Sequence, residues 1–111
     1  MLNRLAVVVN AKQPLVDWVN ATEPGGIEIT LETATEDSSI YLLPDCDSPD
    51  DYPKLLKGAW QEIFESELAA WYTDEARWPP NRTLAMFHEW FDCRFHSTIS
   101  DLCDDLLIDD D

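Results

Sequence analysis

The strongest constraint on the fold is a long apolar repeat in the second half of the chain. Apolar side chains recur at steps of three and four residues between Leu55 and Trp71, which places them on one face of an α-helix. Gly58 lies inside the repeat and weakens the helix by about 1 kcal/mol relative to alanine without ending it. The sequence therefore predicts a long amphipathic helix whose apolar face needs a second layer to cover it. The residues of this face are Leu55, Leu56, Ala59, Trp60, Ile63, Phe64, Leu68 and Trp71.

The first half of the chain supplies candidate strands for that second layer. Residues Arg4–Asn10 form a β-branched run bounded by polar residues, which predicts a buried strand. A short helix is expected to begin near Pro14. Ile27–Leu31 alternates apolar and polar residues and is interpreted as a strand, although TLETATED, which overlaps its end, could form a brief helical turn. Ser39–Leu43, closed by Pro44, predicts a further strand.

The last third of the chain is interpreted as a second long helix that starts near Asn81 or Thr83. Alternation of apolar and polar residues allows a strand from about Asp92 instead, but the helical spacing matches more residues. We therefore expect a single α+β domain over residues 1–111, because this length suits one compact domain. A small sheet of two to three strands from the N-terminal half would pack against two long C-terminal helices. The helical spacing joins Leu84, Phe87, Phe91, Phe95, Thr98, Ile99 and Leu102.

The charge balance restricts the partners of the chain. Seven Lys and Arg residues stand against 23 Asp and Glu residues, giving a net charge of −16. Such a field repels nucleic acids and anionic membrane surfaces and attracts cations or basic proteins. We expect no nucleic-acid partner and no membrane partner, and either a basic protein or a second copy of the chain as a possible partner.

The acidic residues are concentrated in two stretches. The first holds Asp45, Asp47, Asp50 and Asp51, and Ser48-Pro49 in its middle is typical of a helix start. The second is the C-terminal tail, in which Asp104 and Asp105 oppose the dipole of a preceding helix. Residues 104–111 are therefore expected to be a frayed acidic tail. These clusters could dock on a basic patch of a protein, or they could serve solubility alone.

Aromatic residues gather where the long helix ends. Trp71 and Tyr72 stand at this end, and Trp78 lies in the linker that follows. Tryptophan and tyrosine are favoured anchors in protein interfaces, so these three are candidate interaction residues. The alternative is that they cap the core and turn their polar atoms to partners or solvent.

The stretch HEWFDCRFH holds both histidines of the chain, His88 and His96. On a helix they lie about 12 Å apart, which is too far for one zinc ion, and the HExxH spacing is absent. A metal site built from His88, Asp92, His96 and Cys103 would need further ligands from another segment. The favoured interpretation is a packed helix in which His88 is buried and finds a hydrogen-bond partner. No cofactor is expected.

The sequence does not favour an enzyme. It lacks a GxSxG motif, and its three glycines do not form a phosphate-binding loop. Cys46 lies among aspartates, which oppose thiolate formation, and Cys93 would face away from the apolar side of the helix. Three cysteines cannot form a complete set of disulfides, and Leu5–Val9 is too short for a membrane span or a signal sequence. These features favour a cytoplasmic location.

Four segments carry a resemblance: RLAVVVNAKQPLVDWVN, IYLLPDCD, AAWYTDEARWPPNRT and WFDCRFHSTISDL. With these segments the chain resembles a family of small acidic bacterial proteins that has no assigned activity. The resemblance implies a single-domain bacterial cytoplasmic protein and supplies no catalytic residues. The leading hypothesis is a non-enzymatic acidic protein-interaction or regulatory module, and the alternative is the metal-binding protein described above.

Overall fold

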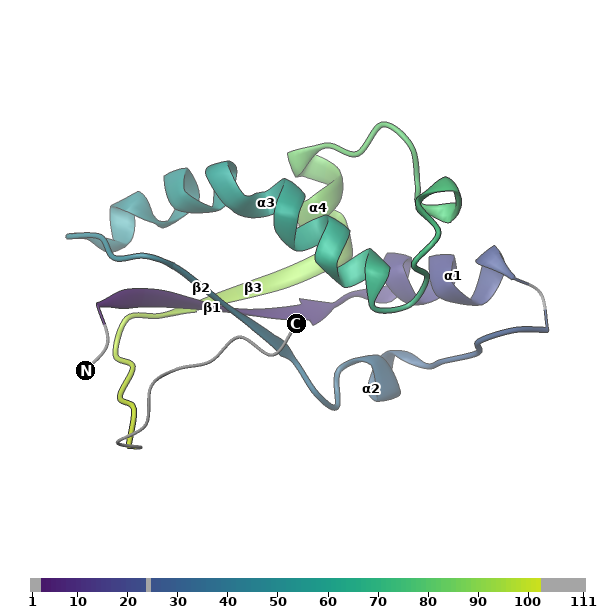
Figure 1. Cartoon of the computed structure of the whole chain (residues 1–111), viewed down its shortest axis with the longest axis horizontal. Coiled ribbons are helices and arrows are strands. Elements are labelled where there is room, and N and C mark those ends of the chain that lie inside the picture. Colours follow the sequence, from purple (N-terminus) through teal and green to yellow (C-terminus); the bar gives the residue numbers. More distant parts are fainter. Residues whose placement is uncertain (1–2, 24, 103–111) are drawn as a thin grey trace.

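The computed structural model describes residues 3–23 and 25–102. This part of the chain forms a three-stranded antiparallel sheet with the strand order β2-β1-β3, and α3 and α4 pack on one face of it (Figure 1). The expected α+β class is therefore confirmed. The elements, in chain order, are β1 (Arg4–Ala11), α1 (Gln13–Thr22), α2 (Leu31–Ala34), β2 (Ser39–Pro44), the 3₁₀ turn η1 (Pro49–Asp51), α3 (Tyr52–Ala69), the 3₁₀ turn η2 (Glu75–Arg77), α4 (Leu84–Trp90) and β3 (Phe91–His96).

β1 is the central strand, as its β-branched sequence predicts. It pairs with β2 through Leu5 opposite Leu43, and with β3 through Ala11 opposite Phe91. Val7 is fully buried and Val9 is 1% exposed, because side chains at alternate positions point to the helices. β2 and β3 are consequently the two edges of the sheet in the described chain.

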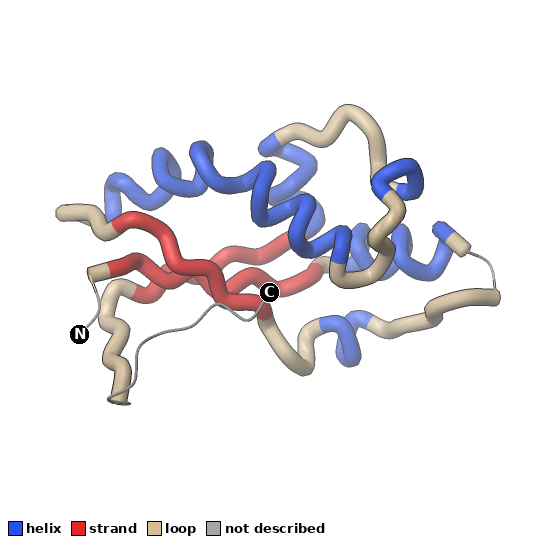
Figure 2. The backbone as a smooth tube through the Cα atoms, viewed as in Figure 1, coloured by secondary structure: helices blue, strands red, loops and turns tan. Residues whose placement is uncertain are grey.

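The long helix α3 covers the sheet, and the strands form one layer beneath it (Figure 2). Phe64 of α3 packs its ring 5.8 Å from that of Phe87 in α4 and 5.4 Å from that of Phe91 in β3. Burial of each of these side chains contributes about 1.5–3 kcal/mol. Among the described residues, no helix combines the length and the apolar character needed to cross a membrane.

The expectation of two long C-terminal helices is wrong. α4 ends at Trp90, and the chain continues as β3 from Phe91, so the alternative of a strand from about Asp92 is confirmed. The physical reason is the second edge of β1, whose backbone groups need a partner that the local sequence does not reveal. Alternation along β3 buries Phe91 and leaves Asp92 exposed. The sheet thus draws its third strand from the C-terminal half.

The expected strand at Ile27–Leu31 is also wrong. The side chain of Asn20 donates to the carbonyl oxygen of Ile29 at 2.9 Å and accepts its N–H at 2.7 Å, replacing a neighbouring strand. Thr30 and Thr33 then form a capping box, in which each side chain accepts the backbone N–H of the other. This cap starts α2, which is the brief helical turn considered as the alternative.

Candidate functional site

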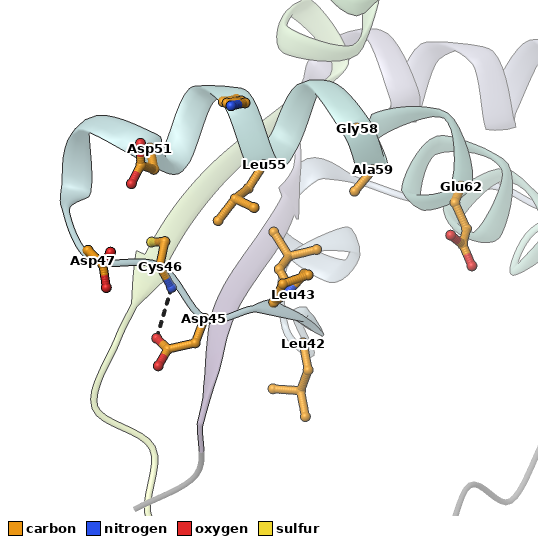
Figure 3. Close-up of a pocket in the computed structure, with 12 residues that line it drawn as sticks. Leu42, Leu43, Asp45, Cys46, Asp47, Asp51, Leu55, Gly58, Ala59 and Glu62 are labelled. Atoms are coloured by element: carbon orange, nitrogen blue, oxygen red, sulfur yellow. Dashed lines mark hydrogen bonds between the residues drawn. The ribbon is translucent and has the colours of Figure 1, made fainter.

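An open groove of about 710 Å³ runs between β2, the acidic loop that follows it and the first half of α3 (Figure 3). We call it the β2–α3 groove. Three of the four aspartates in the first acidic stretch line it, so the fold brings this predicted cluster to a concave surface. The lining residues are Leu42, Leu43, Pro44, Asp45, Cys46, Asp47, Asp51, Lys54, Leu55, Gly58, Ala59 and Glu62.

The floor of the groove is apolar. Leu43 points from β2 toward α3, and Leu55 and Ala59 point from α3 toward β2 (Figure 3). Leu43 is 6% exposed, whereas Leu42, on the opposite face of the strand, is 49% exposed. The alternation of β2 thus buries Leu43 in the floor of the groove and leaves Leu42 exposed at its border.

Charged groups surround this floor. Asp45, Asp47, Asp51 and Glu62 supply four carboxylates, and Lys54 supplies one ammonium group, so the lining carries a net charge of about −3 at neutral pH. Like charges gathered around a low-dielectric surface concentrate a negative potential there. The groove therefore suits a positively charged ligand with apolar parts.

The carboxylates of the groove are not neutralised by the ion pairs of the described chain. Those ion pairs join Arg77 to Glu23 and Asp74, and Arg94 to Asp92. None of the residues in these ion pairs lines the groove.

Local backbone structure holds the acidic loop in place. Asp45 accepts the N–H of Cys46 through Oδ1 at 3.0 Å, and the Cys46 thiol donates to the carbonyl oxygen of Ser48. The Ser48 hydroxyl accepts the N–H of Asp50 at 3.2 Å and caps η1. This confirms the helix start that the sequence predicts at Ser48-Pro49.

The groove continues along β2. A second hollow of about 270 Å³ shares Leu42, Leu43, Ala59 and Glu62 with the first and extends it to Tyr41 and Ser66. At that end the Tyr41 hydroxyl donates a hydrogen bond to Glu67. Burial and the neighbouring Glu67 carboxylate raise the pKa of Tyr41, so its hydroxyl stays protonated and remains a donor.

Gly58 lies on the α3 side of the groove, where it leaves the helix without a side chain. A Cβ atom placed on Gly58 would meet no atom within 4 Å, so packing inside the protein does not require a glycine there. Glycine in a helix interior lowers stability by about 1 kcal/mol relative to alanine. Its main local effect is that α3 presents bare backbone to the groove.

Sequence reasoning found the aspartates but missed the α3 side of the groove. Leu55, Gly58, Ala59 and Glu62 are spaced by three, one and three residues and therefore share one helix face. A glycine and a carboxylate on the border of an apolar face are the signal that could have indicated this surface.

The aromatic candidates lie away from the groove. Tyr72 is 8% exposed and donates its hydroxyl to the carbonyl oxygen of Val19 at 3.0 Å. The indole of Trp78 donates to the carbonyl oxygen of Tyr72 at 2.7 Å, and Trp71 is half-buried against the core. These contacts resemble the core-capping alternative, and they leave little of Tyr72 to contact a partner.

The HEWFDCRFH stretch does not form the continuous packed helix that the sequence favoured, because it is divided between α4 and β3. His88 lies on α4 and is exposed, so the expectation of a buried His88 is wrong. Asp92 and His96 lie on β3, where Asp92 pairs with Arg94 at 3.4 Å. Within residues 3–23 and 25–102, no three His, Cys, Asp or Glu side chains are grouped to hold a metal ion.

Three candidate residues of the C-terminal tail, Cys103, Asp104 and Asp105, lie outside the described residues, as does the rest of the predicted tail at 104–111.

Cys93 is half-buried on β3. Burial, followed by the charge of Asp92, raises the pKa of its thiol from 9.0 to about 11. The thiolate is therefore scarce at neutral pH, which is unfavourable for a nucleophile.

No protein-family model, curated protein or solved structure matches the chain. The resemblance to small acidic bacterial proteins stays an expectation from the sequence. The geometry and charge of the β2–α3 groove are the features of the molecule that indicate a function.

Proposed function

We propose that the protein is a non-enzymatic acidic interaction module that binds a basic segment of another protein in the β2–α3 groove. The observation that carries this proposal is the combination of an apolar floor with four surrounding carboxylates in one concave surface. A ligand with a long aliphatic stem and a cationic head matches both parts.

Lysine and arginine side chains have this composition. Their methylene stems can cover Leu55 and Ala59 while their heads reach Asp51 or Glu62. The net charge of −16 adds long-range attraction for a basic partner and opposes the approach of nucleic acids. It also opposes a second copy of the chain, so a basic protein is favoured over a homodimer.

The test is the binding of fluorescently labelled peptides rich in lysine and arginine, followed by anisotropy. The groove variant carries Asp45→Asn, Asp47→Asn and Asp51→Asn. The control variant carries Glu28→Gln, Glu32→Gln and Glu89→Gln, which removes the same charge at exposed positions away from the groove. We expect the groove variant to bind about tenfold more weakly, because each exposed ion pair contributes about 0.2–1 kcal/mol. The control should weaken binding much less.

The dependence of binding on ionic strength provides a second test of the proposal. Raising it from about 0.01 M to about 0.15 M shortens the screening length from about 30 Å to about 8 Å and should weaken binding to the wild-type protein. Equal losses in the two variants would show that only overall charge matters, and binding that ignores salt and charge removal would overturn the proposal.

A further inference from the structure

We infer that the basic segment binds as an added β-strand along the free edge of β2, with basic and apolar side chains alternating. This inference rests on the proposed function and specifies the conformation and sequence pattern of the partner. In the described chain β2 pairs with β1 on one side only. Alternate residues of such an edge direct their N–H and C=O groups away from the sheet, where another strand can pair with them.

The residues of β2 themselves carry none of the usual protections against an added strand. Edge strands are commonly protected by charged residues, by a central proline or by a bulge. Ser39–Pro44 contains no charged residue, and its proline is the last residue of the strand. Ile40 is 64% exposed and Leu42 is 49% exposed. The edge therefore combines open backbone groups with exposed apolar side chains, as strand-addition surfaces do.

The groove follows the same edge. Its two hollows share Leu42 and Leu43 and together extend from the acidic loop to Tyr41, which is most of the length of β2. An extended segment suits this course, because it can run parallel to β2 and pair with its backbone along the length of the groove. Gly58 supports this placement, since α3 projects no side chain at that point.

The two faces of β2 differ, and this difference predicts the partner's sequence. Successive side chains of an added strand point to opposite faces of the sheet. On the α3 side they meet Leu43 together with carboxylates such as Asp51 and Glu62, which suits lysine and arginine. On the other side they meet Ile40 and Leu42, which suit valine, isoleucine or leucine. The predicted pattern is a basic residue at every second position.

A second copy of the chain fits this edge poorly. Antiparallel pairing of β2 with another β2 would place residues that precede one strand beside residues that follow the other. Glu36 and Asp37 of one copy would then approach Asp45 and Asp47 of its partner copy. Like charges directly opposite each other are destabilising. The charge pattern therefore selects a basic partner.

The first experiment compares labelled peptides of identical composition. One alternates lysine and valine, and the other has all its lysines before its valines. We expect the alternating peptide to bind at least about tenfold more tightly, because only this pattern places lysine on the groove side at every contact. Equal affinity for the two peptides overturns strand addition, whereas salt-dependent binding of both still supports the proposed function.

Backbone methylation tests the hydrogen bonds directly. In two further alternating peptides, either the lysines or the valines carry N-methyl groups. Since only one of these sets directs its N–H groups to β2, we expect one peptide to lose binding and the other to retain it. If both retain binding, strand addition is overturned and capture by charge remains. If no basic peptide binds in a salt-dependent way, both the inference and the proposed function fall.

A variant pair locates the contact on the protein. Ile40→Lys adds a charge to the edge, and Ile27→Lys makes the same substitution at an exposed isoleucine away from β2. We expect Ile40→Lys to lower the affinity for the alternating peptide by at least about tenfold and Ile27→Lys to change it little. Both sites are exposed, so circular dichroism should show both variants folded. Equal affinities of the two variants overturn the placement on β2.

Discussion

Asp50 and Asp51 are neighbours in η1, yet only Asp51 lines the β2–α3 groove. The two residues have the same charge and nearly the same place in the sequence, so they form a natural pair for testing the groove. We predict that Asp51→Asn lowers the affinity for a lysine-rich peptide by about two- to fivefold, because an exposed ion pair contributes about 0.2–1 kcal/mol. Asp50→Asn should have a smaller effect. Anisotropy at low ionic strength measures both.

Comparable losses for the two single variants would contradict this prediction. They would show that the peptide responds to the general charge of the loop and does not contact the carboxylates that face α3.

Gly58 separates helix stability from access to the groove. Gly58→Ala should raise the free energy of unfolding by about 0.5–1 kcal/mol, because alanine is a better helix former and its methyl group meets no atom within 4 Å. Gly58→Leu should also stabilise the helix relative to glycine, but its larger side chain would occupy the groove. We predict that urea unfolding shows both variants to be stable, while Gly58→Leu binds the peptide several-fold more weakly. Unchanged binding by Gly58→Leu would place the ligand elsewhere.

Cys93 should make the free energy of unfolding fall as the pH rises through the alkaline range. Burial raises the pKa of its thiol in the folded chain to about 11, from 9.0 without that environment. The folded state therefore binds this proton more tightly than the unfolded state does. The resulting stability is fully present below about pH 9 and is lost as pH rises toward about pH 11.

The test uses a Cys46→Ser, Cys103→Ser background, in which Cys93 is the remaining thiol. Alkylation by iodoacetamide should show an inflection near pH 11 in the native protein and near pH 9 in urea. In the Cys93→Ser variant, this part of the pH dependence of the unfolding free energy should disappear. A native inflection near pH 9 would show that the thiol is well solvated.

Much of the sheet and the long helix follows from local sequence. The β-branched run at the start of the chain is strand β1, and the apolar repeat after Leu55 is helix α3, because both patterns match one period well. The acidic stretch also pointed to the candidate site. The residues of α3 that complete the groove could not be predicted from the sequence, because the groove forms only when β2 and α3 pack together.

The end of the chain shows why local periodicity was insufficient. Phe91 and Phe95 are four residues apart, and this spacing fits both a helix face and alternate positions of a strand. Pairing with β1, in which Phe95 lies opposite Val7, decides between them. This pairing joins residues that are far apart in the sequence, so no local window contains it.

Asn20 illustrates the same point and leads to a last prediction. Its side-chain amide makes two hydrogen bonds to the backbone of Ile29, so that Ile27–Leu31 is held without a neighbouring strand. We predict that Asn20→Ala lowers the free energy of unfolding by about 1–2 kcal/mol, because it leaves partly buried backbone groups without their partner. Gln13→Ala removes an exposed hydrogen bond to Asp17 at the start of α1 and should lower the free energy of unfolding much less. Urea unfolding measures both, and faster hydrogen exchange of the Ile29 amide in Asn20→Ala should locate the effect. Unchanged exchange at Ile29 would show that contacts other than Asn20 hold this segment.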